Sequence, residues 1–332
     1  KLLEINNLIS LKYFFINLKL NDTNQGIYAV EEGFSKELIE RNKRRNGPIF
    51  GIDEEVSDRV EGVVYPNVLF DLYSKNYWLE NYPELIENAL SKLNNLKKKN
   101  VNIEDVFDLE KWATYFAIID LSNGIHGAIS KSVKLHYNVV TSKFEPIGFD
   151  AQIDPEYYTD FLLLDFLNPK NNNCGPYCYD REWFLKFLKK NDGKLNYEFV
   201  NLYLKKLKEI SSDKFLINFN NEYSKKINFF NSQIYSENST KVRGLYKGLG
   251  LYIFDKDYLN KRSNYIKSRL DKIDEIEKLQ FSLKGEKIIF EDIGKLFLKR
   301  LNINCKNEEI RKEYIYNDLE INFDQNCKYS IG

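Results

Sequence analysis

Residues 108–150, DLEKWATYFAIIDLSNGIHGAISKSVKLHYNVVTSKFEPIGFD, decide the fold of this chain. Apolar residues recur at helical spacing over about 105–121, which predicts a helix with one face in a core. The polar loop SNGIHG follows, then VKLHYNVV alternates like a strand, and a TSK turn leads into a second strand, FEPIGFD. Pro146 cannot donate a ladder hydrogen bond, so we expect this strand at a sheet edge or at a bulge. A helix, a loop and a hairpin in this order indicate an α+β protein.

The segments on either side fit the same α+β class. Upstream we expect two strands, a helix with Ser35 as its N-cap, a short strand and a further helix, over 11–20, 26–32, 35–45, 48–53 and 83–98. Downstream, residues 160–283 have a mainly helical pattern. The order predicts two lobes and an appended segment: a partial N-terminal lobe over 1–60, a mainly helical lobe over 61–285 that includes the hairpin 123–150, and an appendage over 286–332.

Composition describes a folded chain without a strong overall charge. It has 332 residues, 43% of them hydrophobic, and Lys+Arg equals Asp+Glu at 49 each. This balance provides no global field for nucleic acid, which is not expected as a partner. No run of about 18 apolar residues occurs, so we expect no membrane-spanning helix. The chain starts with Lys and contains no Met, which suggests an excised piece whose N-terminal beginning and any targeting signal lie upstream.

Two further motifs leave alternatives open. The sequence CGPYC at 174–178 can hold a metal or form a short disulfide. Both histidines of the chain lie elsewhere in the sequence, so ordinary thiols or a structural disulfide are favoured over zinc. The basic run Lys43-Arg44-Arg45 is either a solvated helix end, which suits the helix dipole, or a phosphate contact.

Candidate reactive groups gather in the segment that decides the fold. The only two histidines, His126 and His136, lie there, and Asp150 follows the last apolar residue of the second strand. Phosphoryl transfer requires a carboxylate for Mg²⁺, a second polar ligand and a group that orients the acceptor hydroxyl. Each residue also has a plain structural interpretation. Asp150 can be a turn residue, His136 can lie at the surface on the polar face of its strand beside Lys134, and His126 is balanced between the two interpretations.

Two blocks of the sequence together resemble the CotH kinase family, atypical kinase-like proteins associated with bacterial spore coats. The first is GIYAVEEGFSKELIERNKRRNGPIF, with a G-x-Y-x-x-x-E pattern ahead of a helix, and the second is the segment quoted above, which ends in EPIGFD. The resemblance covers about residues 5–155. It implies a two-lobed, protein-kinase-like fold in which residues 1–60 belong to the nucleotide lobe. It also implies that the protein binds ATP with Mg²⁺ and phosphorylates Ser or Thr of a protein.

The resemblance assigns roles to individual residues. Asp150 matches the metal-binding aspartate, Glu32 matches the acidic residue that braces the nucleotide lobe, and the loop around His126 matches the catalytic loop. Asp120 is the nearest upstream carboxylate for a catalytic role, although its place on a helix also permits it to face solvent. Ser132 aligns with the second metal ligand, which is typically Asn in the family.

Three departures from the family pattern affect the expected activity. Gly51 stands where members often carry the phosphate-pairing Lys, so either Lys131 or Lys134 supplies the amine or none does. Ser132 is a weaker Mg²⁺ ligand than Asn, and the loop offers His126 where many members have Asp. Losing one positioned contact removes roughly 2–4 kcal/mol of transition-state stabilisation.

The alternative is therefore a catalytically inactive kinase-like protein, a pseudokinase, in spore-coat or surface assembly. Its partners would be coat or surface proteins instead of a protein substrate. A location at the spore coat, at the cell surface or outside the cell is implied by the resemblance alone.

Overall fold

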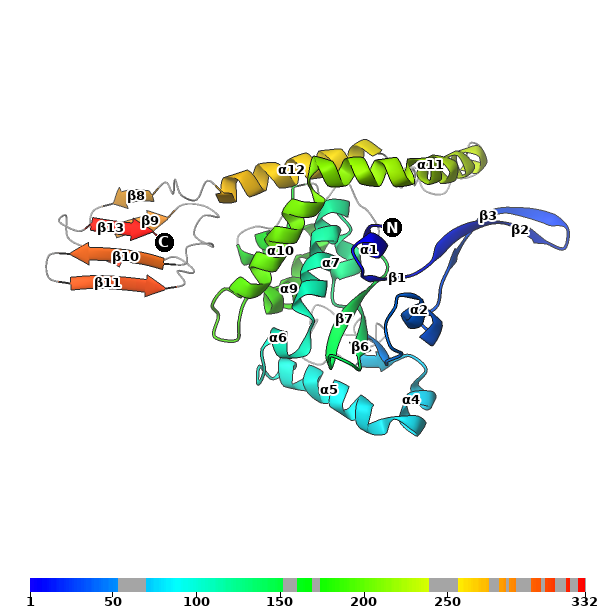
Figure 1. The fold of residues 1–332 in the computed structure, drawn as a ribbon, viewed down its shortest axis with the longest axis horizontal. Helices are drawn as coiled ribbons and strands as arrows, with labels where there is room; N and C mark the ends of the chain where they lie inside the picture. The colour runs from blue at the N-terminus through cyan, green and yellow to red at the C-terminus, as the bar shows by residue number, and fades with distance from the viewer. Residues whose placement is uncertain are drawn as a thin grey trace.

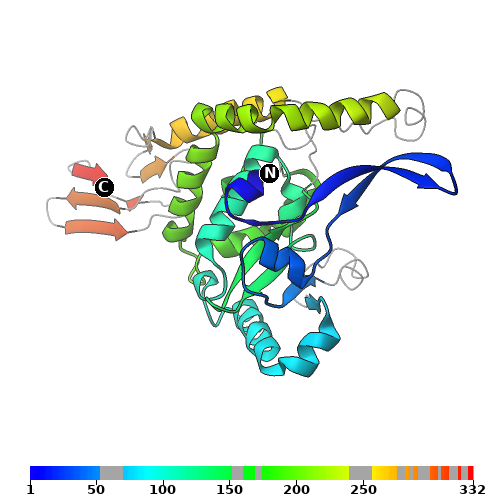
Figure 2. The ribbon, with the colours of Figure 1, turned by 45° about the vertical axis from the view of Figure 1, so that its right-hand side comes forward.

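The computed structural model describes residues 1–52, 70–151, 160–168, 174–238 and 256–274, together with short strands after residue 280. It is a mixed α+β structure, which confirms the fold class expected from the sequence (Figure 1). A five-stranded sheet and the helices around it form the centre. A long two-stranded arm extends from the centre on one side, and the C-terminal strands lie at the opposite end (Figures 1 and 2).

The elements follow the predicted order. The helices are α1 (Leu2–Ile5), α2 (Lys36–Arg41), α4 (Lys75–Asn81), α5 (Pro83–Lys97), α6 (Ile103–Val106), α7 (Leu109–Ser122), α9 (Arg181–Leu188), α10 (Tyr197–Ile210), α11 (Asp213–Asn238) and α12 (Lys256–Asp274), with 3-10 helices η1 (Ile125–Ala128), η2 (Leu163–Leu167) and η3 (Gly175–Asp180). The strands of the main body are β1 (Ile9–Ser10), β2 (Tyr13–Leu20), β3 (Thr23–Glu31), β4 (Ile49–Ile52), β5 (Phe70–Leu72), β6 (Lys134–Asn138) and β7 (Lys143–Gly148).

The C-terminal strands form two separate three-stranded sheets. Their orders are β11-β10-β13 and β12-β9-β8. The strands are β8 (Phe281–Lys284), β9 (Lys287–Phe290), β10 (Arg300–Cys305), β11 (Glu308–Glu313), β12 (Ile321–Asn322) and β13 (Lys328–Ile331). No helix in the described ranges combines the length and the apolar character that crossing a bilayer requires.

The central sheet joins segments that are far apart in the sequence. Its order is β1-β7-β6-β4-β5, so the β6–β7 hairpin lies between strands from the N-terminal part of the chain. β6 pairs antiparallel with β4, which places Gly51 opposite Lys134 and Ile49 opposite His136. The predicted hairpin 123–150 therefore shares a sheet with the segment 1–60.

The expectation that the strand with Pro146 lies at an edge or carries a bulge is wrong. β7 has β6 on one side and β1 on the other, and the β6–β7 register runs without a shift. β1 is only two residues long and starts opposite Ile147, one residue after Pro146. Among the described residues, no strand therefore pairs with Pro146 on the β1 side, which is why proline is tolerated inside the sheet.

One face of the sheet packs on α7 and forms the main core. Phe50, Leu135 and Phe144 from three strands belong to this core, and Trp112 of α7 donates its indole N–H to the Phe144 carbonyl at 3.0 Å. α7 is buried on nearly all sides because α10 packs against it as well (Figure 1). A helix that is apolar around its circumference belongs in an interior.

The other face of the sheet carries polar as well as apolar side chains and is equally buried, which overturns the surface position suggested for His136. The residues Leu38 and Ile39 of α2 pack on this face with Ile147, and His136 is 0% exposed while Lys134 is 4% exposed. A helix can cover polar side chains such as those of His136 and Lys134, provided that other groups compensate their charges.

A buried ion pair compensates part of this face. Arg44 Nε lies 3.0 Å from Glu145 Oε2, and the two side chains are 8% and 4% exposed. Arg44 also donates to the Asn7 carbonyl at 2.6 Å. Both interpretations of the basic run are therefore wrong for Arg44, which connects the end of α2 to β7 inside the protein.

His136 lies beside this pair as a neutral ring. Burial lowers the pKa of His136 to about 4, although the charge of Glu145 opposes the shift. The Arg45 backbone also opposes the shift of the His136 pKa. Neither ring nitrogen of His136 lies in hydrogen-bonding geometry with a partner. Gly47 has to be a glycine here, since a Cβ would lie 2.2 Å from the Tyr137 carbonyl oxygen.

His136 should make the fold sensitive to acid. The unfolded chain protonates this ring near pH 6.5, whereas the folded chain resists protonation down to about pH 4. Stability from the neutral ring is present above pH 6.5 and is lost as the pH falls towards 4. We expect the wild type to lose about 2 kcal/mol of unfolding free energy between pH 8 and pH 5 that the variant His136→Leu retains. Urea unfolding of both proteins at both pH values measures this, and equal losses would contradict it.

Candidate functional site

The His126 loop and the end of β7 meet directly. Nδ1 of His126, on η1, lies 2.9 Å from the Asp150 carbonyl oxygen and 3.0 Å from Asp150 Oδ2. The approach is close because Gly127 has no side chain: a Cβ there would lie 2.6 Å from the Phe149 carbonyl oxygen. Asp150 has a φ of 50°, in the left-handed region that Asp tolerates better than most residues. The structure thus brings together the expected catalytic histidine and the expected metal ligand.

A buried carboxylate holds the His126 loop from behind. Asp180, at the end of η3, accepts hydrogen bonds from Ser130 N at 2.5 Å and from Ser130 Oγ at 2.8 Å. Asp180 is 0% exposed, and burial raises the pKa of its carboxyl to about 7 against the effect of these two hydrogen bonds. Two contacts from the core hold the same loop: the Tyr115 hydroxyl on the Gly127 carbonyl at 2.7 Å and Trp183 Nε1 on the Ala128 carbonyl at 2.9 Å.

Sequence reasoning missed Asp180. It lies fifty residues from Ser130 along the chain, and its local sequence, CYDREW, has no feature that separates it from an ordinary turn aspartate. Its one local signal is its place two residues after CGPYC, a motif that constrains the backbone if it is oxidised.

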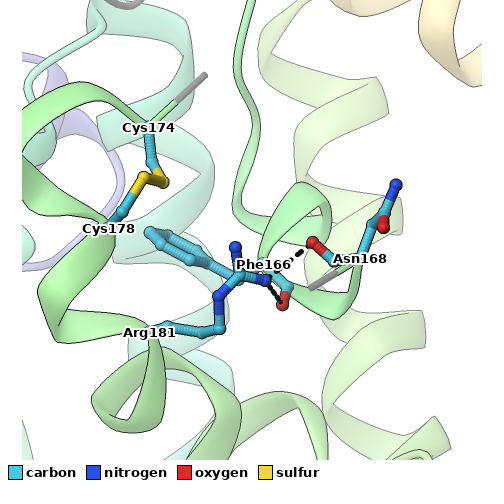
Figure 3. The surroundings of a disulfide bond; sticks show 5 residues. All are labelled: Phe166, Asn168, Cys174, Cys178 and Arg181. Carbon is cyan, nitrogen blue, oxygen red and sulfur yellow. Dashed lines mark hydrogen bonds between the residues drawn. A yellow bond between two sulfur atoms is a disulfide. The ribbon is translucent and has the colours of Figure 1, made fainter. Parts of the chain in front are cut away.

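A disulfide holds the segment that carries Asp180. Cys174 and Cys178 are bonded to each other, so of the alternatives for CGPYC the disulfide is confirmed (Figure 3). Tyr177, between them, places its ring edge-on to the ring of His126 with the centroids 5.8 Å apart. The short cross-linked segment therefore contacts the His126 loop twice, through Tyr177 and through Asp180.

Arg181 fastens the other end of this segment. Its guanidinium donates to the carbonyl oxygens of Phe166 at 2.6 Å and of Asn168 at 2.7 Å, as Figure 3 shows. Its guanidinium carbon also lies 5.9 Å from the centre of the Phe166 ring. η2 and η3 are thereby joined beside the disulfide.

Lys134 occupies the space above Gly51. A Cβ built on Gly51 would lie 3.3 Å from Lys134 Cδ and 3.5 Å from Lys134 Nζ. The Lys134 ammonium also lies 5.3 Å from the centre of the Phe149 ring, within the range of a cation–π interaction. An amine from β6 therefore lies beside Gly51 of β4.

Glu32 braces the N-terminal strands. Its carboxylate accepts hydrogen bonds from the Lys12 amide at 2.8 Å and from Arg41 Nε at 3.0 Å, and a second Arg41 nitrogen pairs with it. These contacts connect β3, the start of β2 and α2. For the neighbouring Glu31, burial raises the pKa of the carboxyl, and the negative charge of Asp150 raises it further.

Asp120 does not join His126 and Asp150. It is 7% exposed, so the solvent-facing alternative is wrong, and its carboxylate accepts hydrogen bonds from the Tyr203 hydroxyl and from Leu163 N at 3.2 Å. Arg262 donates to the Asp120 carbonyl at 2.7 Å. Burial raises the pKa of the Asp120 carboxyl to about 7, against these contacts. Its partners come from α10, α12 and the start of η2, and they join three parts of the helical core.

The remaining two expected residues lie in the turn before β6. Ser132 is 2% exposed, and its amide donates to the Ile129 carbonyl at 3.1 Å. Lys131, beside it, is partly exposed. Of the two candidate amines, Lys134 is the one that lies next to Gly51.

The carboxylate arrangement fits a metal that arrives with its ligand. In the described ranges, no three His, Cys, Asp or Glu side chains converge to hold a metal. The Asp150 side chain is 41% exposed and so remains accessible. Mg²⁺ is usually held by one or two carboxylates together with substrate phosphates and water, and not by a cage of protein ligands. The donor set therefore suits Mg²⁺ bound with a phosphate group.

An amine, an accessible carboxylate and a histidine lie close together at one end of the central sheet. The family model for CotH kinase protein matches residues 2–273. The chain therefore belongs to the CotH kinase family, and the match extends well beyond the part that the sequence motifs cover. Among curated proteins, none matches the chain.

The disulfide should stabilise both the fold and the His126 loop. It closes a loop of five residues, for which chain entropy gives roughly 2 kcal/mol. We expect the double variant Cys174→Ser/Cys178→Ser to lose about this much unfolding free energy in urea. We also expect the Ser130 amide, which donates to Asp180, to exchange its hydrogen faster. Adding a reductant should reproduce both effects in the wild type and change nothing in the double variant. If the Ser130 amide of the double variant exchanges as slowly as in the wild type, the disulfide does not hold the His126 loop in place.

Proposed function

We propose that this chain is a kinase-like phosphotransferase that binds ATP with Mg²⁺ and transfers the γ-phosphoryl group to Ser or Thr of a protein. The observation that carries the proposal is the contact of His126 with Asp150 at the end of the sheet face that holds Lys134. Phosphoryl transfer depends on positioning and on charge stabilisation, and these residues offer a metal ligand, a cation and a proton acceptor in one place. Membership of the CotH kinase family supports the same class of activity.

Each residue has a distinct role in this proposal. Mg²⁺, when bound, supplies charge neutralisation on the phosphates. Asp150 offers the carboxylate oxygen that holds it, with Ser132 as the second, weaker ligand. Lys134 offers a positive charge to the phosphate oxygens from a site that is 4% exposed, where solvent and salt screen the attraction little.

His126 is the candidate proton acceptor. Its Nδ1 lies on the Asp150 oxygens, so the ring donates there and keeps the lone pair on Nε2. A neutral imidazole oriented in this way can accept the proton of an acceptor hydroxyl. Tyr177 and the Asp180–Ser130 contact restrict the movement of the loop, and a fixed orientation is what makes a general base effective. In this proposal Asp120 acts by joining helices of the core.

The family supports the proposed acceptor, and the family and the disulfide together support the proposed location. The proposed partners are a protein substrate or other coat and surface proteins. The Cys174–Cys178 disulfide supports a spore-coat, surface or exported location, because disulfides persist in oxidising environments.

A second candidate function is supported by Ser132. The residue at the second-ligand position is 2% exposed and carries only a neutral hydroxyl on a short arm. This favours an inactive kinase-like protein that acts in coat or surface assembly. Such a protein would not need to bind nucleotide with metal, and this property distinguishes the two candidates.

Removal of the Asp150 carboxylate should abolish metal-dependent nucleotide binding. For wild type at 100 times the dissociation constant, Mg-ATP should add about 2.7 kcal/mol of stability, seen as a rise in melting temperature. We expect Asp150→Asn to show no such rise while its melting temperature without ligand stays near that of wild type. Asp22→Asn, in the exposed turn between β2 and β3, should respond like wild type.

The outcomes separate the hypotheses. An unchanged response of Asp150→Asn would contradict its role as metal ligand. No response of the wild type up to millimolar ATP would favour the inactive alternative.

A lysine swap tests the origin of the phosphate-pairing amine. We expect Lys134→Leu to weaken ATP binding roughly 10- to 100-fold, the range for a charge-assisted hydrogen bond. Gly51→Lys alone should give no gain, because Lys134 already occupies that space. The double variant Gly51→Lys/Lys134→Leu should recover most of the affinity, and Lys131→Leu serves as the matched control. Isothermal titration measures all four; a loss in Lys131→Leu instead of Lys134→Leu would reverse the assignment.

A further inference from the structure

A pocket of about 220 Å³ lies where the ends of α5 and α9 meet α6, and we call it the α5–α9 pocket (Figure 1). Among the described residues that line it, none belongs to the groups assigned to phosphoryl transfer. In the described part of the chain, its walls carry a single carboxylate, that of Glu182, and four lysines: Lys99, Lys186, Lys189 and Lys190. It is therefore a cationic site apart from the one already described.

Side-chain and backbone hydrogen bonds hold the segments that carry these lysines. Asn191, in the turn after α9, donates from Nδ2 to the carbonyl oxygens of Lys99 at 3.1 Å and of Val101 at 2.8 Å. In the same turn the Lys190 amide donates to the Lys194 carbonyl at 2.8 Å. The turn after α9 and the loop after α5 are thereby joined, so the lysines on them keep their positions relative to each other.

The positive charge of the α5–α9 pocket is only partly compensated. Lys190 Nζ lies 3.8 Å from Glu104 Oε1, which is a loose ion pair. Burial lowers the pKa of the Lys186 amine, and the positive charge of Lys99 lowers it further, against the opposing charge of Glu182. The negative ends of the helix dipoles favour lysines at this place, yet Lys99 and Lys186 still repel each other. A bound anion would remove this repulsion.

The inner wall of the pocket is apolar. Leu96 and Ile103 line it and are 7% and 2% exposed. Lysine stems cover such surface while their ammonium groups stay at its edge. Water and salt screen charges less beside a buried wall than on open surface, so an anion held here is attracted more strongly.

The number of amines favours a doubly charged anion over a carboxylate. A phosphomonoester carries about −1.5 to −2 charges at neutral pH and three acceptor oxygens. Each lysine ammonium has three donors and binds phosphate as a point charge. The volume lies below the roughly 300–1,000 Å³ of sites for larger small molecules, and so it suits a single phosphorylated side chain.

We infer that the α5–α9 pocket binds a phosphomonoester group, presented by a phosphoserine or phosphothreonine of a protein. Binding of the phosphate stands on the pocket alone, whereas the protein source rests on the proposed function, whose product is such a side chain. Lys186 lies six residues along α9 from Asp180, about 9 Å. A part of the partner that is already phosphorylated is thus held beyond the His126 loop, outside the site at Asp150.

Binding of a phosphopeptide to wild type and variants tests the inference. The probe is a short fluorescent peptide of alanine and glycine with one phosphoserine, and the same peptide with serine is the reference. We expect Lys99→Gln/Lys186→Gln to raise the dissociation constant for the phosphopeptide about 10- to 100-fold, the range for loss of charge-assisted hydrogen bonds. Lys97→Gln/Lys194→Gln, which removes the same charge from exposed lysines nearby, should bind like wild type. Fluorescence anisotropy measures binding, and circular dichroism checks the fold of each variant.

Protection of lysines from acetylation provides a second readout on the wild type, without any variant. A limiting dose of acetic anhydride labels neutral amines, and mass spectrometry reads each site. With the phosphopeptide at ten times its dissociation constant, Lys99 and Lys186 should react about tenfold more slowly, because only the free fraction of the protein reacts. Lys97 and Lys194 should react as before, and the serine peptide should protect none of the four.

Each outcome supports or overturns the inference. Binding that Lys99→Gln/Lys186→Gln weakens and Asp150→Asn does not weaken, with protection of the two pocket lysines, supports it. Equal losses in the control double variant overturn it, and so does a loss in Asp150→Asn instead, since the phosphate would then lie at the metal site. Protection by inorganic phosphate but not by the phosphopeptide overturns the protein source alone.

Mg-ATP binding by the same protein separates this inference from the proposed function. Phosphopeptide binding without Mg-ATP binding overturns the proposed function and leaves the phosphate pocket standing. Mg-ATP binding without binding of either the phosphopeptide or inorganic phosphate at the pocket lysines overturns the pocket and leaves the proposed function standing.

Discussion

The pairing of β6 with β4 is the constraint on which the rest of the structure depends. It inserts the hairpin between the N-terminal strands, and it sets Lys134 opposite Gly51 and His136 opposite Ile49. A shift of one residue would turn Lys134 and His136 towards α7 and place Leu135 under α2. The apolar face, with Phe50 and Phe144 on α7, prevents such a shift because it would expose the polar residues to the main core.

Gly51 and Gly127 allow close approach at the two places where the site is assembled. At Gly51 the missing side chain admits Lys134 from the neighbouring strand, and at Gly127 it admits the backbone around Phe149. A methyl group at Gly127 would force the His126 loop away from Asp150. The site thus depends as much on where side chains are missing as on the groups that carry charge.

Buried polar contacts hold the His126 loop in place, whereas the carboxylate of Asp150 stays accessible. Asp180 is fully buried on Ser130, and Tyr115 and Trp183 hold the carbonyl groups of the same loop. Asp150, by contrast, is 41% exposed. Such a division is expected where a scaffold must hold a loop still and yet leave its reactive groups open to a ligand.

The sequence by itself determined the elements whose signals are local. The helical periodicity of α5 and α7 and the alternation of β6 and β7 predicted the bounds of these elements to within a few residues. The order of the chain predicted that His126 and Asp150 flank one hairpin. Only the tertiary structure decided which faces of these elements are buried. The polar face of β6 looked like a surface because alternation shows two faces but cannot say what covers each. The contacts of Asp180 with Ser130 and of Arg44 with Glu145 span 50 and 101 residues, so no local pattern could predict them.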